Sequence, residues 1–292
     1  MANGRIIKAL SGFYYVEAMG KVYQCKGRGV FRKKNITPLV GDIVTFDISG
    51  ENEGYILEIQ PRKNELLRPP VANIDQAIIV NSAIKPTFNT TLLDRFLVLV
   101  EAEGIKPVIF FTKLDLVKQE KDQFLAYKKD YRQIGYDVVM LSVKNMEETS
   151  VLERYFKDKI TVIAGQSGVG KTTLLNAIDP SLSLKTGKIS TSLGRGKHTT
   201  RHVELIPLLG GLVADTPGFS SLEFQDIPLS ELADCFPEMK KRKNDCKFRG
   251  CMHVKEPKCA VKQAVEAGEI PKYRYDNYVR FYEEIKRRKP RY

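Results

Sequence analysis

One stretch decides the fold of this 292-residue chain: residues 160–173, which read ITVIAGQSGVGKTT. A mostly apolar run, Ile160–Ala164, is typical of a buried strand and is followed at Gly165–Thr172 by the pattern G-x-x-x-x-G-K-[ST] and then by a helical segment. Glycines let backbone N–H groups converge on phosphate oxygens, and the start of the helix adds its positive dipole. The alternative is a glycine-rich turn that binds nothing. We expect a phosphate-binding loop.

This loop predicts specific contacts to a nucleotide and to a metal ion. Lys171 is expected to bridge the β- and γ-phosphates and to act in catalysis, and Thr172 to bind Mg²⁺. The loop residues that we predict to bind the nucleotide are Gly165, Gln166, Ser167, Gly168, Val169, Gly170, Lys171, Thr172 and Thr173.

The stretch lies in a repeated strand–helix pattern. Apolar runs alternate with amphipathic segments, the runs at 76–81, 107–112, 138–142 and 160–164 and the segments at 92–103, 121–134, 149–157 and 172–177. Two further runs, 203–209 and 211–214, are joined by a tight Gly210-Gly211 turn and predict a hairpin. The pattern predicts an α/β domain, in which helices cover a mostly parallel sheet.

Two motifs at other strand ends can read a guanine base. Thr112-Lys113-Leu114-Asp115 follows an apolar run, and the Asp115 carboxylate can accept both the N1 and the N2 protons of guanine, a donor pair that adenine lacks. Lys113 would lie along the base plane. A backbone N–H for the guanine O6 could come from the segment after the next strand, Ser142, Val143 and Lys144. Taken alone, a T-K-x-D turn is usually just a helix start.

A fourth motif, Asp215-Thr216-Pro217-Gly218, ends the predicted hairpin. An acid that faces the phosphate loop can hold Mg²⁺, directly or through water, and Gly218 lets its N–H approach a γ-phosphate. The base-reading motifs therefore precede the phosphate loop, whereas they come last in ordinary small GTPases. In this order the chain resembles a circularly permuted GTPase. The fold permits it because every motif sits at the C-terminal edge of one parallel sheet.

The residues before this domain predict a small barrel. Alternating strands are expected at 13–18, 21–25, 30–33, 42–49 and 55–59. Five short strands in the first 60 residues fit an OB-type barrel that binds nucleic acid, although an SH3-like barrel without that role has a comparable pattern. Residues 64–73, which contain Arg68-Pro69-Pro70, are interpreted as a linker.

The residues after the domain hold a compact set of metal-ligand residues. Cys246, Cys251, His253 and Cys259 lie within fourteen residues, and three thiolates with one imidazole are the ligands of a closed structural Zn²⁺ site. A catalytic zinc, an iron–sulfur cluster or unligated buried cysteines are the alternatives. The other two cysteines, Cys25 and Cys235, are expected in the core.

The basic charge of the chain is concentrated at its two ends. Residues 1–70 carry 11 basic and 7 acidic side chains, residues 71–238 carry 19 and 21, and residues 239–292 carry 17 and 7. Basic ends around a near-neutral centre suggest that the ends meet a polyanion, whereas a generic solubility charge is the alternative. Because no apolar run could span a bilayer and Met1–Leu10 lacks a signal-peptide region, we expect a cytoplasmic protein that does not bind membranes.

The basic barrel, the permuted motifs and the Cys₃His module together resemble the ribosome small subunit-dependent GTPase A (RsgA) family across essentially the whole chain. We accordingly expect an OB-type RNA-binding barrel at 1–66, a circularly permuted GTPase domain at 67–222 and a mainly helical zinc-binding domain at 223–292. The resemblance implies GTP hydrolysis on the small ribosomal subunit during its late maturation, contacts to rRNA, one structural Zn²⁺, Mg²⁺ with GTP, and regulation by guanosine tetraphosphate. We expect a monomer.

The chain departs from the usual GTPase motifs at Thr112, where Asn is usual. Asn ties the base loop to the phosphate loop, so we expect the hydroxyl to keep one of those hydrogen bonds at lower nucleotide affinity. After Gly218 comes Phe219, where many GTPases place the Gln that orients the attacking water. His198 is the best candidate for that role in the sequence, and the alternative is a group supplied by the subunit.

His198 lies in residues 194–200, GRGKHTT, which occupy the position of the first switch. Either Thr199 or Thr200 is expected to close on Mg²⁺ when the γ-phosphate is present. Two other functions compete with a ribosomal one. A GTP-dependent switch could bind another structured RNA, and a kinase or ATPase could use the same phosphate loop, although Asp115 disfavours the latter.

Overall fold

The computed structural model describes residues 1–29, 31, 36–67, 69–117, 121–141, 149–182, 203–215, 222–224 and 226–288. The chain divides into two compact units, the first made of residues 1–78 and 145–220 and the second of residues 79–144 and 221–292. Strand β8 (Gln76–Ser82) begins in the first unit and ends in the second.

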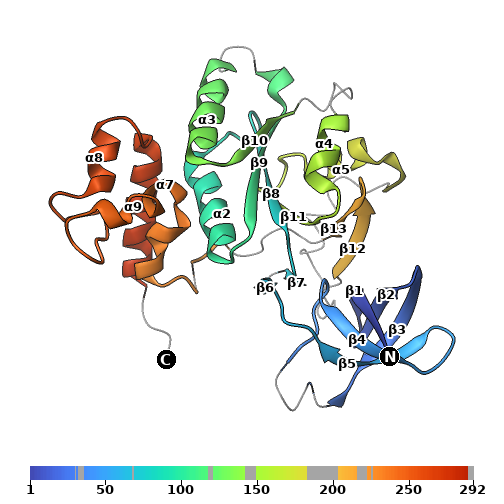
Figure 1. Cartoon of the computed structure of the whole chain (residues 1–292). Helices are drawn as coiled ribbons and strands as arrows, with labels where there is room; N and C mark the ends of the chain where they lie inside the picture. The colour runs from blue at the N-terminus through green and yellow to red at the C-terminus, as the bar shows by residue number, and fades with distance from the viewer. Residues whose placement is uncertain are drawn as a thin grey trace. The chain divides into compact units, whose positions relative to one another are not determined.

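The first unit begins with a closed barrel, drawn in blue in Figure 1. Its five strands are β1 (Ala2–Leu10), β2 (Phe13–Ala18), β3 (Lys21–Gly27), β4 (Ile43–Ile48) and β5 (Glu53–Ile59). They pair in the ring β1-β2-β3-β5-β4-β1, with β3 and β5 parallel and the other pairs antiparallel. Alternate side chains point inward, and Ile6, Val16, Cys25, Val44, Phe46 and Ile56 are fully buried. The predicted OB-type barrel is confirmed.

Three details of the predicted N-terminal part differ from the structure. Strand β1 was not predicted, and the strand predicted at 30–33 is wrong at Phe31, which is helical; the rest of that stretch lies outside the described residues. The predicted linker contains a small hairpin of β6 (Glu65–Leu67) and β7 (Pro70–Ala72). Proline lacks only the N–H donor, so Pro70 can still begin a short edge strand.

The same unit contains one half of the α/β domain. Strand β11 (Ile160–Ala164) runs parallel to β13 (Gly211–Asp215), and β13 forms an antiparallel hairpin with β12 (Val203–Leu208). Helices α4 (Thr149–Phe156) and α5 (Lys171–Ile178) and the 3-10 helix η3 (Pro180–Leu182) complete it. Gly211 allows the hairpin to approach the end of α4, because a Cβ there would lie 1.8 Å from the Phe156 carbonyl oxygen.

One strand of the barrel pairs with one strand of the hairpin. Strand β1 pairs with β12 through Lys8–Glu204 and Ala9–Val203, and the Lys8 ammonium lies 3.2 Å from the Glu204 carboxylate. The sheet of the barrel therefore continues into the hairpin.

The second unit begins with the other half of the α/β domain. Its strands follow the order β10 (Asp137–Met140), β9 (Lys106–Thr112) and β8, with β9 and β10 parallel. Helix α2 (Thr90–Ala102), helix α3 (Lys121–Ile134) and the 3-10 helix η1 (Leu114–Leu116) accompany them. Asn89 caps the start of α2, because its side-chain oxygen accepts a hydrogen bond from the Leu92 N–H at 3.1 Å. The predicted strand–helix alternation is confirmed.

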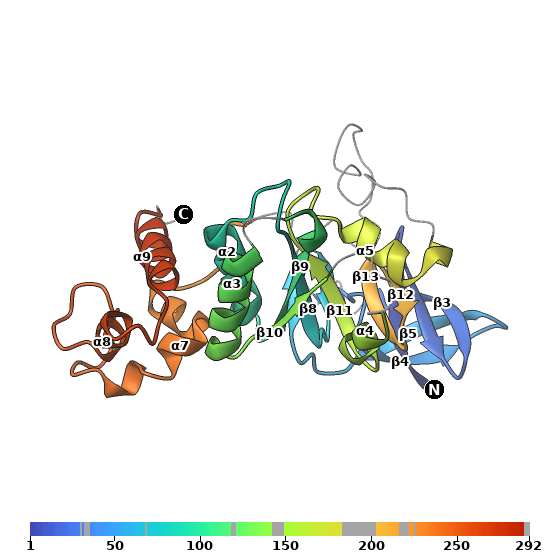
Figure 2. The ribbon, with the colours of Figure 1, turned by 90° about the horizontal axis from the view of Figure 1, so that it is seen from above.

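The C-terminal part of this unit is mainly helical, as predicted. It contains η4 (Leu229–Cys235), α7 (Pro237–Lys240), η5 (Lys243–Asp245), α8 (Ala260–Glu266) and α9 (Lys272–Lys286). Its core is formed by Leu232, Phe236, Met239, Val261, Tyr278 and Phe281, and Val98 of α2 joins it. Helix α9 lies beside α2, as both ribbon views show (Figures 1 and 2).

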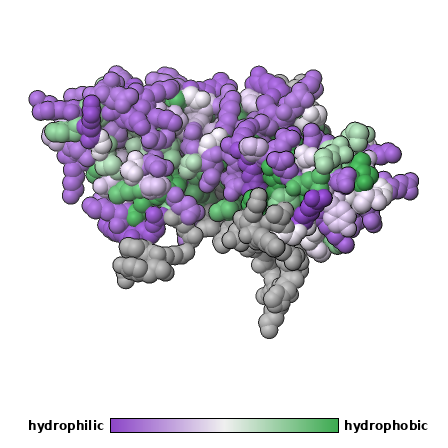
Figure 3. Space-filling model, turned by 60° about the horizontal axis from the view of Figure 1, so that its bottom comes forward, coloured by the Kyte–Doolittle hydropathy of each residue, from purple (hydrophilic) through white to green (hydrophobic). Residues whose placement is uncertain are grey.

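Both isolated cysteines are buried, as expected. Burial raises the pKa of Cys25 to about 11 and that of Cys235 to about 12. The face in Figure 3 is mostly hydrophilic, with smaller groups of hydrophobic residues between. Within the described part of the chain, no helix has the length and apolar character needed to cross a bilayer.

Candidate functional site

The predicted phosphate loop joins a buried strand to a helix. All five residues of β11 are buried, and α5 begins at Lys171, directly after the loop. Gly165, Gly168 and Gly170 have φ values of 139°, 82° and 100°, a region that residues with a Cβ rarely adopt. The loop therefore has the strand–loop–helix context and the glycine conformations that a phosphate cradle requires.

Lys171 lies across this loop. Its Nζ donates hydrogen bonds to the carbonyl oxygens of Gly165 at 2.7 Å and Gln166 at 3.0 Å. Burial lowers the pKa of the ammonium. Phosphate oxygens at this point would offer the charged form a stronger acceptor than neutral carbonyls do. Thr172 is half-buried in the first turn of α5, and Thr173 is exposed beside it.

Asp215 ends the strand next to the one that leads into the loop. The parallel register pairs Ile160 with Leu212 and Val162 with Ala214, so β11 and β13 end at the same edge of the sheet. The backbone of Asp215 therefore lies at the edge where the phosphate loop begins. Its side chain and Gly218 are outside what the structure describes.

The predicted base-reading residues lie in the second unit. Thr112 is the buried last residue of β9, and its hydroxyl donates to the Asn81 carbonyl oxygen at 3.3 Å. Lys113 has a left-handed φ of 60°, and its Nζ donates to the Lys85 carbonyl oxygen at 2.6 Å. Asp115 is exposed in η1. The predicted bond from Thr112 to the phosphate loop stays a prediction.

The second base-reading segment follows the neighbouring strand end. The Leu141 N–H donates to the Phe111 carbonyl oxygen at 2.7 Å, so the chain leaves β10 beside the end of β9. Ser142, Val143 and Lys144 come next and lie outside the described residues. The switch residues His198, Thr199 and Thr200 also lie outside them, and their roles stay predictions.

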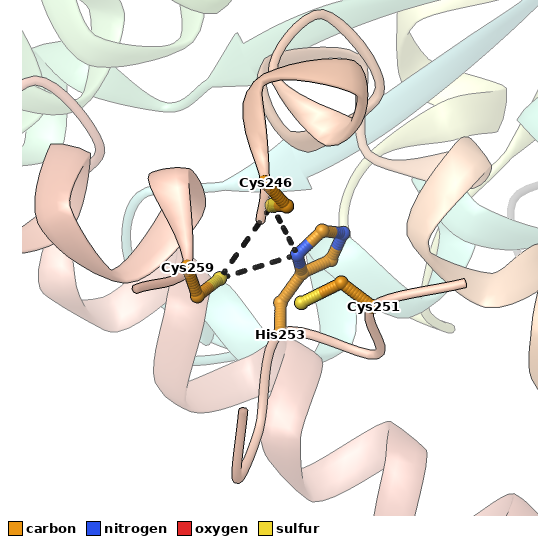
Figure 4. Close-up of side chains that lie close together, drawn as sticks. All are labelled: Cys246, Cys251, His253 and Cys259. Carbon is orange, nitrogen blue, oxygen red and sulfur yellow. Dashed lines mark hydrogen bonds between the residues drawn. The ribbon is translucent and has the colours of Figure 1, made fainter. Parts of the chain in front are cut away.

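The four predicted metal ligands come together in the C-terminal region (Figure 4). Their ligand atoms all lie within 4.8 Å of one another. The His253 Nδ1 lies 3.6 Å from the Cys246 Sγ and 3.3 Å from the Cys259 Sγ, and those two sulfurs are 3.9 Å apart. A tetrahedral zinc with ordinary bond lengths needs edges of about 3.5–3.8 Å. The three separations among Cys246, His253 and Cys259 are near these values, and the Cys251 sulfur lies within 4.8 Å of the other three atoms, so the cluster could hold a four-coordinate metal.

Neighbouring groups hold the ligand loop in shape. The Glu256 carboxylate accepts hydrogen bonds from the backbone N–H groups of Met252, Val254 and Lys255 at 2.9–3.1 Å. Burial alone would raise the pKa of Glu256, but these donors hold it below its usual value. The hydroxyls of Tyr275 and Tyr278 donate to the carbonyl oxygens of His253 and Met252. Sequence reasoning missed this second layer of contacts, because the tyrosines are remote in sequence.

Three basic residues near the metal cluster have partners inside the unit. Arg242 pairs with Glu269 at 2.9 Å, Lys243 pairs with Asp234 at 2.6 Å, and the Lys241 Nζ lies 3.5 Å from the Ile134 carbonyl oxygen. Part of the C-terminal basic surplus is therefore engaged within the fold.

The chain matches known proteins along its whole length. The RsgA N-terminal domain family matches residues 3–56, and the RsgA GTPase family matches residues 59–225. A protein of Bacillus subtilis (strain 168) named small ribosomal subunit biogenesis GTPase RsgA is 60% identical over 298 residues, 100% of both chains. A protein of Oceanobacillus iheyensis named small ribosomal subunit biogenesis GTPase RsgA 2 is 61% identical over 293 residues, again covering both chains fully.

Solved structures show the same similarity. The crystal structure of YloQ, described as a circularly permuted GTPase, has a TM-score of 0.86 and 56% identity, covering 100% of this chain and 97% of that one. The structure of YjeQ from Thermotoga maritima has a TM-score of 0.87 and 37% identity, covering 99% of both. The phosphate loop, the barrel and these matches together show that the chain belongs to the RsgA GTPase family.

Proposed function

We propose that this GTPase acts in the biogenesis of the small ribosomal subunit, and that the subunit stimulates its hydrolysis of GTP to GDP and phosphate. One observation carries the proposal: the Bacillus subtilis protein that is 60% identical over the whole chain bears that function in its name. The basic surplus at both ends of the chain supports contacts to rRNA. The division of labour follows the three expected domains, 1–66, 67–222 and 223–292.

The nucleotide would bind through the phosphate loop and the predicted base-reading residues. The phosphate loop and Lys171 would hold the phosphates, with Thr172 and Asp215 on Mg²⁺. The base would be read by Thr112, Lys113, Asp115, Ser142, Val143 and Lys144. Gly218 and either Thr199 or Thr200 would respond to the γ-phosphate. His198 would orient the attacking water.

The Cys₃His cluster would hold one Zn²⁺ with a structural role. Four protein ligands leave no open coordination position for chemistry, and the four ligand atoms already lie within 4.8 Å of one another. The metal would fix the loop from Cys246 to Cys259, in addition to the contacts that Glu256, Tyr275 and Tyr278 make with its backbone. We further propose that the protein is a cytoplasmic monomer.

Guanosine tetraphosphate would compete with GTP, because it offers the same guanine and a 5′-diphosphate. It lacks the γ-phosphate that would complete the switch, so the bound form would associate weakly with the subunit. Tight subunit binding by the alarmone-bound chain would contradict this.

Co-sedimentation tests the main proposal. The full chain is centrifuged with small subunits, large subunits or free structured RNA, in GDP or in a non-hydrolysable GTP analogue, and GTP turnover is measured with each. We expect binding to small subunits in the GTP-like state and faster hydrolysis there. Equal binding to unrelated structured RNA would favour the RNA-switch alternative. Displacement of labelled GTP by ATP as effectively as by GTP would remove the guanine assignment.

A further inference from the structure

One phenylalanine differs from the others that the structure describes. The ring of Phe248 is 43% exposed, whereas none of the remaining described phenylalanines is among the exposed large hydrophobic residues. The Lys247 ammonium lies over its ring, with the Nζ 5.5 Å from the ring centre, in a cation–π contact. The exposed part of an apolar side chain gains nothing from the hydrophobic effect, so it is available for a partner.

The metal cluster fixes the position of this ring. Phe248 lies in the sequence Cys246-Lys-Phe-Arg-Gly-Cys251, and both cysteines direct their sulfurs to the cluster (Figure 4). The loop between them is therefore anchored at each end. Gly250 has a φ of 70°, and a Cβ there would meet nothing within 4 Å, so the loop has open space around this residue. A ring held on such a loop loses little conformational freedom when it binds.

The segment that contains Phe248 is rich in exposed cations. Lys247, Arg249, Lys255 and Lys258 belong to the same metal-binding loop and are all exposed. None of the four forms an ion pair with any residue in the described part of the chain. The acids of this loop and its border are Asp245 and Glu256, and Glu256 is occupied by backbone N–H donors. This combination of aromatic ring and free cations favours a polyanion with flat, apolar faces over an apolar protein surface.

We propose that Phe248 stacks on an unpaired base of RNA while Lys247 and Arg249 contact the flanking phosphates. Base faces are accessible only where the strand is single and unstacked, so the ligand is a single-stranded loop, bulge or end and not a duplex. The inference rests on the proposed function, because that function supplies an RNA partner.

Fluorescence can report the stacking directly, because the chain contains no tryptophan. In the full-length zinc-loaded chain, Phe248→Trp introduces a single indole at this position, and stacking on a base quenches indole emission. We expect a mixed-sequence 12-nucleotide single-stranded RNA to quench it strongly and the matching duplex to quench it weakly. Leu125→Trp, at a position on α3 that is 45% exposed, is the matched control and should change little.

Affinity gives the second measurement. One stacked base corresponds to about a fivefold to 150-fold change in affinity. Phe248→Ala should therefore bind small subunits about five- to 150-fold more weakly, and Phe248→Tyr, which keeps the ring, should bind like the unmodified chain. Zinc content and helical circular dichroism should be unchanged in both variants, which separates loss of stacking from loss of fold.

The outcomes separate this inference from the proposed function. If the unmodified chain binds small subunits, and if Phe248→Ala binds equally well and the Phe248→Trp emission is unquenched, stacking is refuted while the function stands. Equal quenching by the duplex would also overturn the stacking. If single-stranded RNA quenches the Phe248→Trp emission but no subunit binds the chain, the function fails and the stacking is supported.

Discussion

A buried charge network joins the C-terminal helices to the α/β domain, and its disruption should be costly. Arg274 of α9 is fully buried and lies 2.5 Å from Asp94 of α2 and 2.8 Å from Glu238 of α7. Asn277 and the Tyr131 hydroxyl also donate to Asp94, at 2.6 and 2.7 Å. We therefore expect Arg274→Met to destabilise the packing of α9 against α2 strongly.

The expected magnitude follows from the burial of the partners. Removing Arg274 leaves two carboxylates, each less than a twentieth exposed, without their shared cation. Breaking a buried pair in this way costs about 3–5 kcal/mol, mostly because the remaining charge stays buried. Lys272→Met, on the same helix, removes a pair whose members are 78% and 53% exposed and should cost less than about 0.5 kcal/mol.

The pH dependence has a definite sign. Burial raises the pKa of Asp94, and Arg274 opposes that rise. In Arg274→Met the folded-state pKa of Asp94 should rise further above its unfolded value, so the folded form binds the extra proton. Stability of the variant is then retained at low pH and lost as the pH rises towards the raised pKa, by up to about 1.4 kcal/mol per pH unit. The deficit relative to the unmodified chain should be smaller at pH 5 than at pH 8.

Hydrogen exchange provides the assay, because a chain with two compact units need not unfold in one step. Amides of α9 should exchange roughly 10²- to 10⁴-fold faster in Arg274→Met, and those of the barrel should not change. A change in the α9 exchange rates below about fivefold, or one equal to that of Lys272→Met, would refute the view that this network stabilises the packing of α9 against α2.

Three other predictions concern metal, catalysis and RNA binding. Cys259→Ser should retain less than half an equivalent of zinc by elemental analysis and lose amide protection after about residue 240. GTP binding should persist, because both the phosphate loop and the strands that carry the base-reading residues lie outside the segment that the metal would hold. Full metal retention would contradict the site. His198→Ala should keep GTP and subunit binding but lose at least about tenfold in stimulated turnover, near 1.4 kcal/mol, and an unchanged rate with saturating subunits would end that assignment. Affinity for the small subunit should fall as the salt concentration rises. The double variant Lys21→Gln, Lys26→Gln should make the plot of log K against log salt less steep by about 1 for each charge that contacts a phosphate. An unaltered slope would place the RNA surface elsewhere.

The central strands were predictable because burial on both faces makes each of them mostly apolar. All residues of β8 and β11 are buried, so their sequences alone identify them. Strand β1 gives no such signal. Only Ile6 is buried within it, and Gly4, Arg5 and Lys8 interrupt any alternation. Its strand character depends on pairing with β2, β4 and β12, which are distant partners that a local pattern does not show.

Among the candidate sites too, those built from residues close in sequence were predictable and contacts between distant residues were not. The phosphate loop and the metal cluster consist of ligands close together in sequence, so their spacing predicted them. The pairing of Asp94 with Arg274 spans 180 residues, and an arginine within a charged helix looks solvent-exposed in sequence. Likewise, the sequence shows a basic surplus in residues 239–292 but not which of its members are paired, and the structure pairs Arg242 and Lys243 each with an acid of their own unit.

The link between barrel and hairpin changes how the RNA-binding role of the barrel should be tested. Removing residues 1–66 would delete β1, expose the backbone edge of β12 and leave Glu204 without Lys8. Strand β12 pairs in turn with β13, which ends at Asp215, so the deletion would disturb the strand that carries a predicted magnesium ligand. A change in GTP affinity after that deletion would not distinguish lost RNA contacts from a damaged sheet. Substitution of the exposed Lys21 and Lys26 removes charge while leaving every one of these strand pairs intact, so GTP affinity should then stay constant while salt dependence weakens.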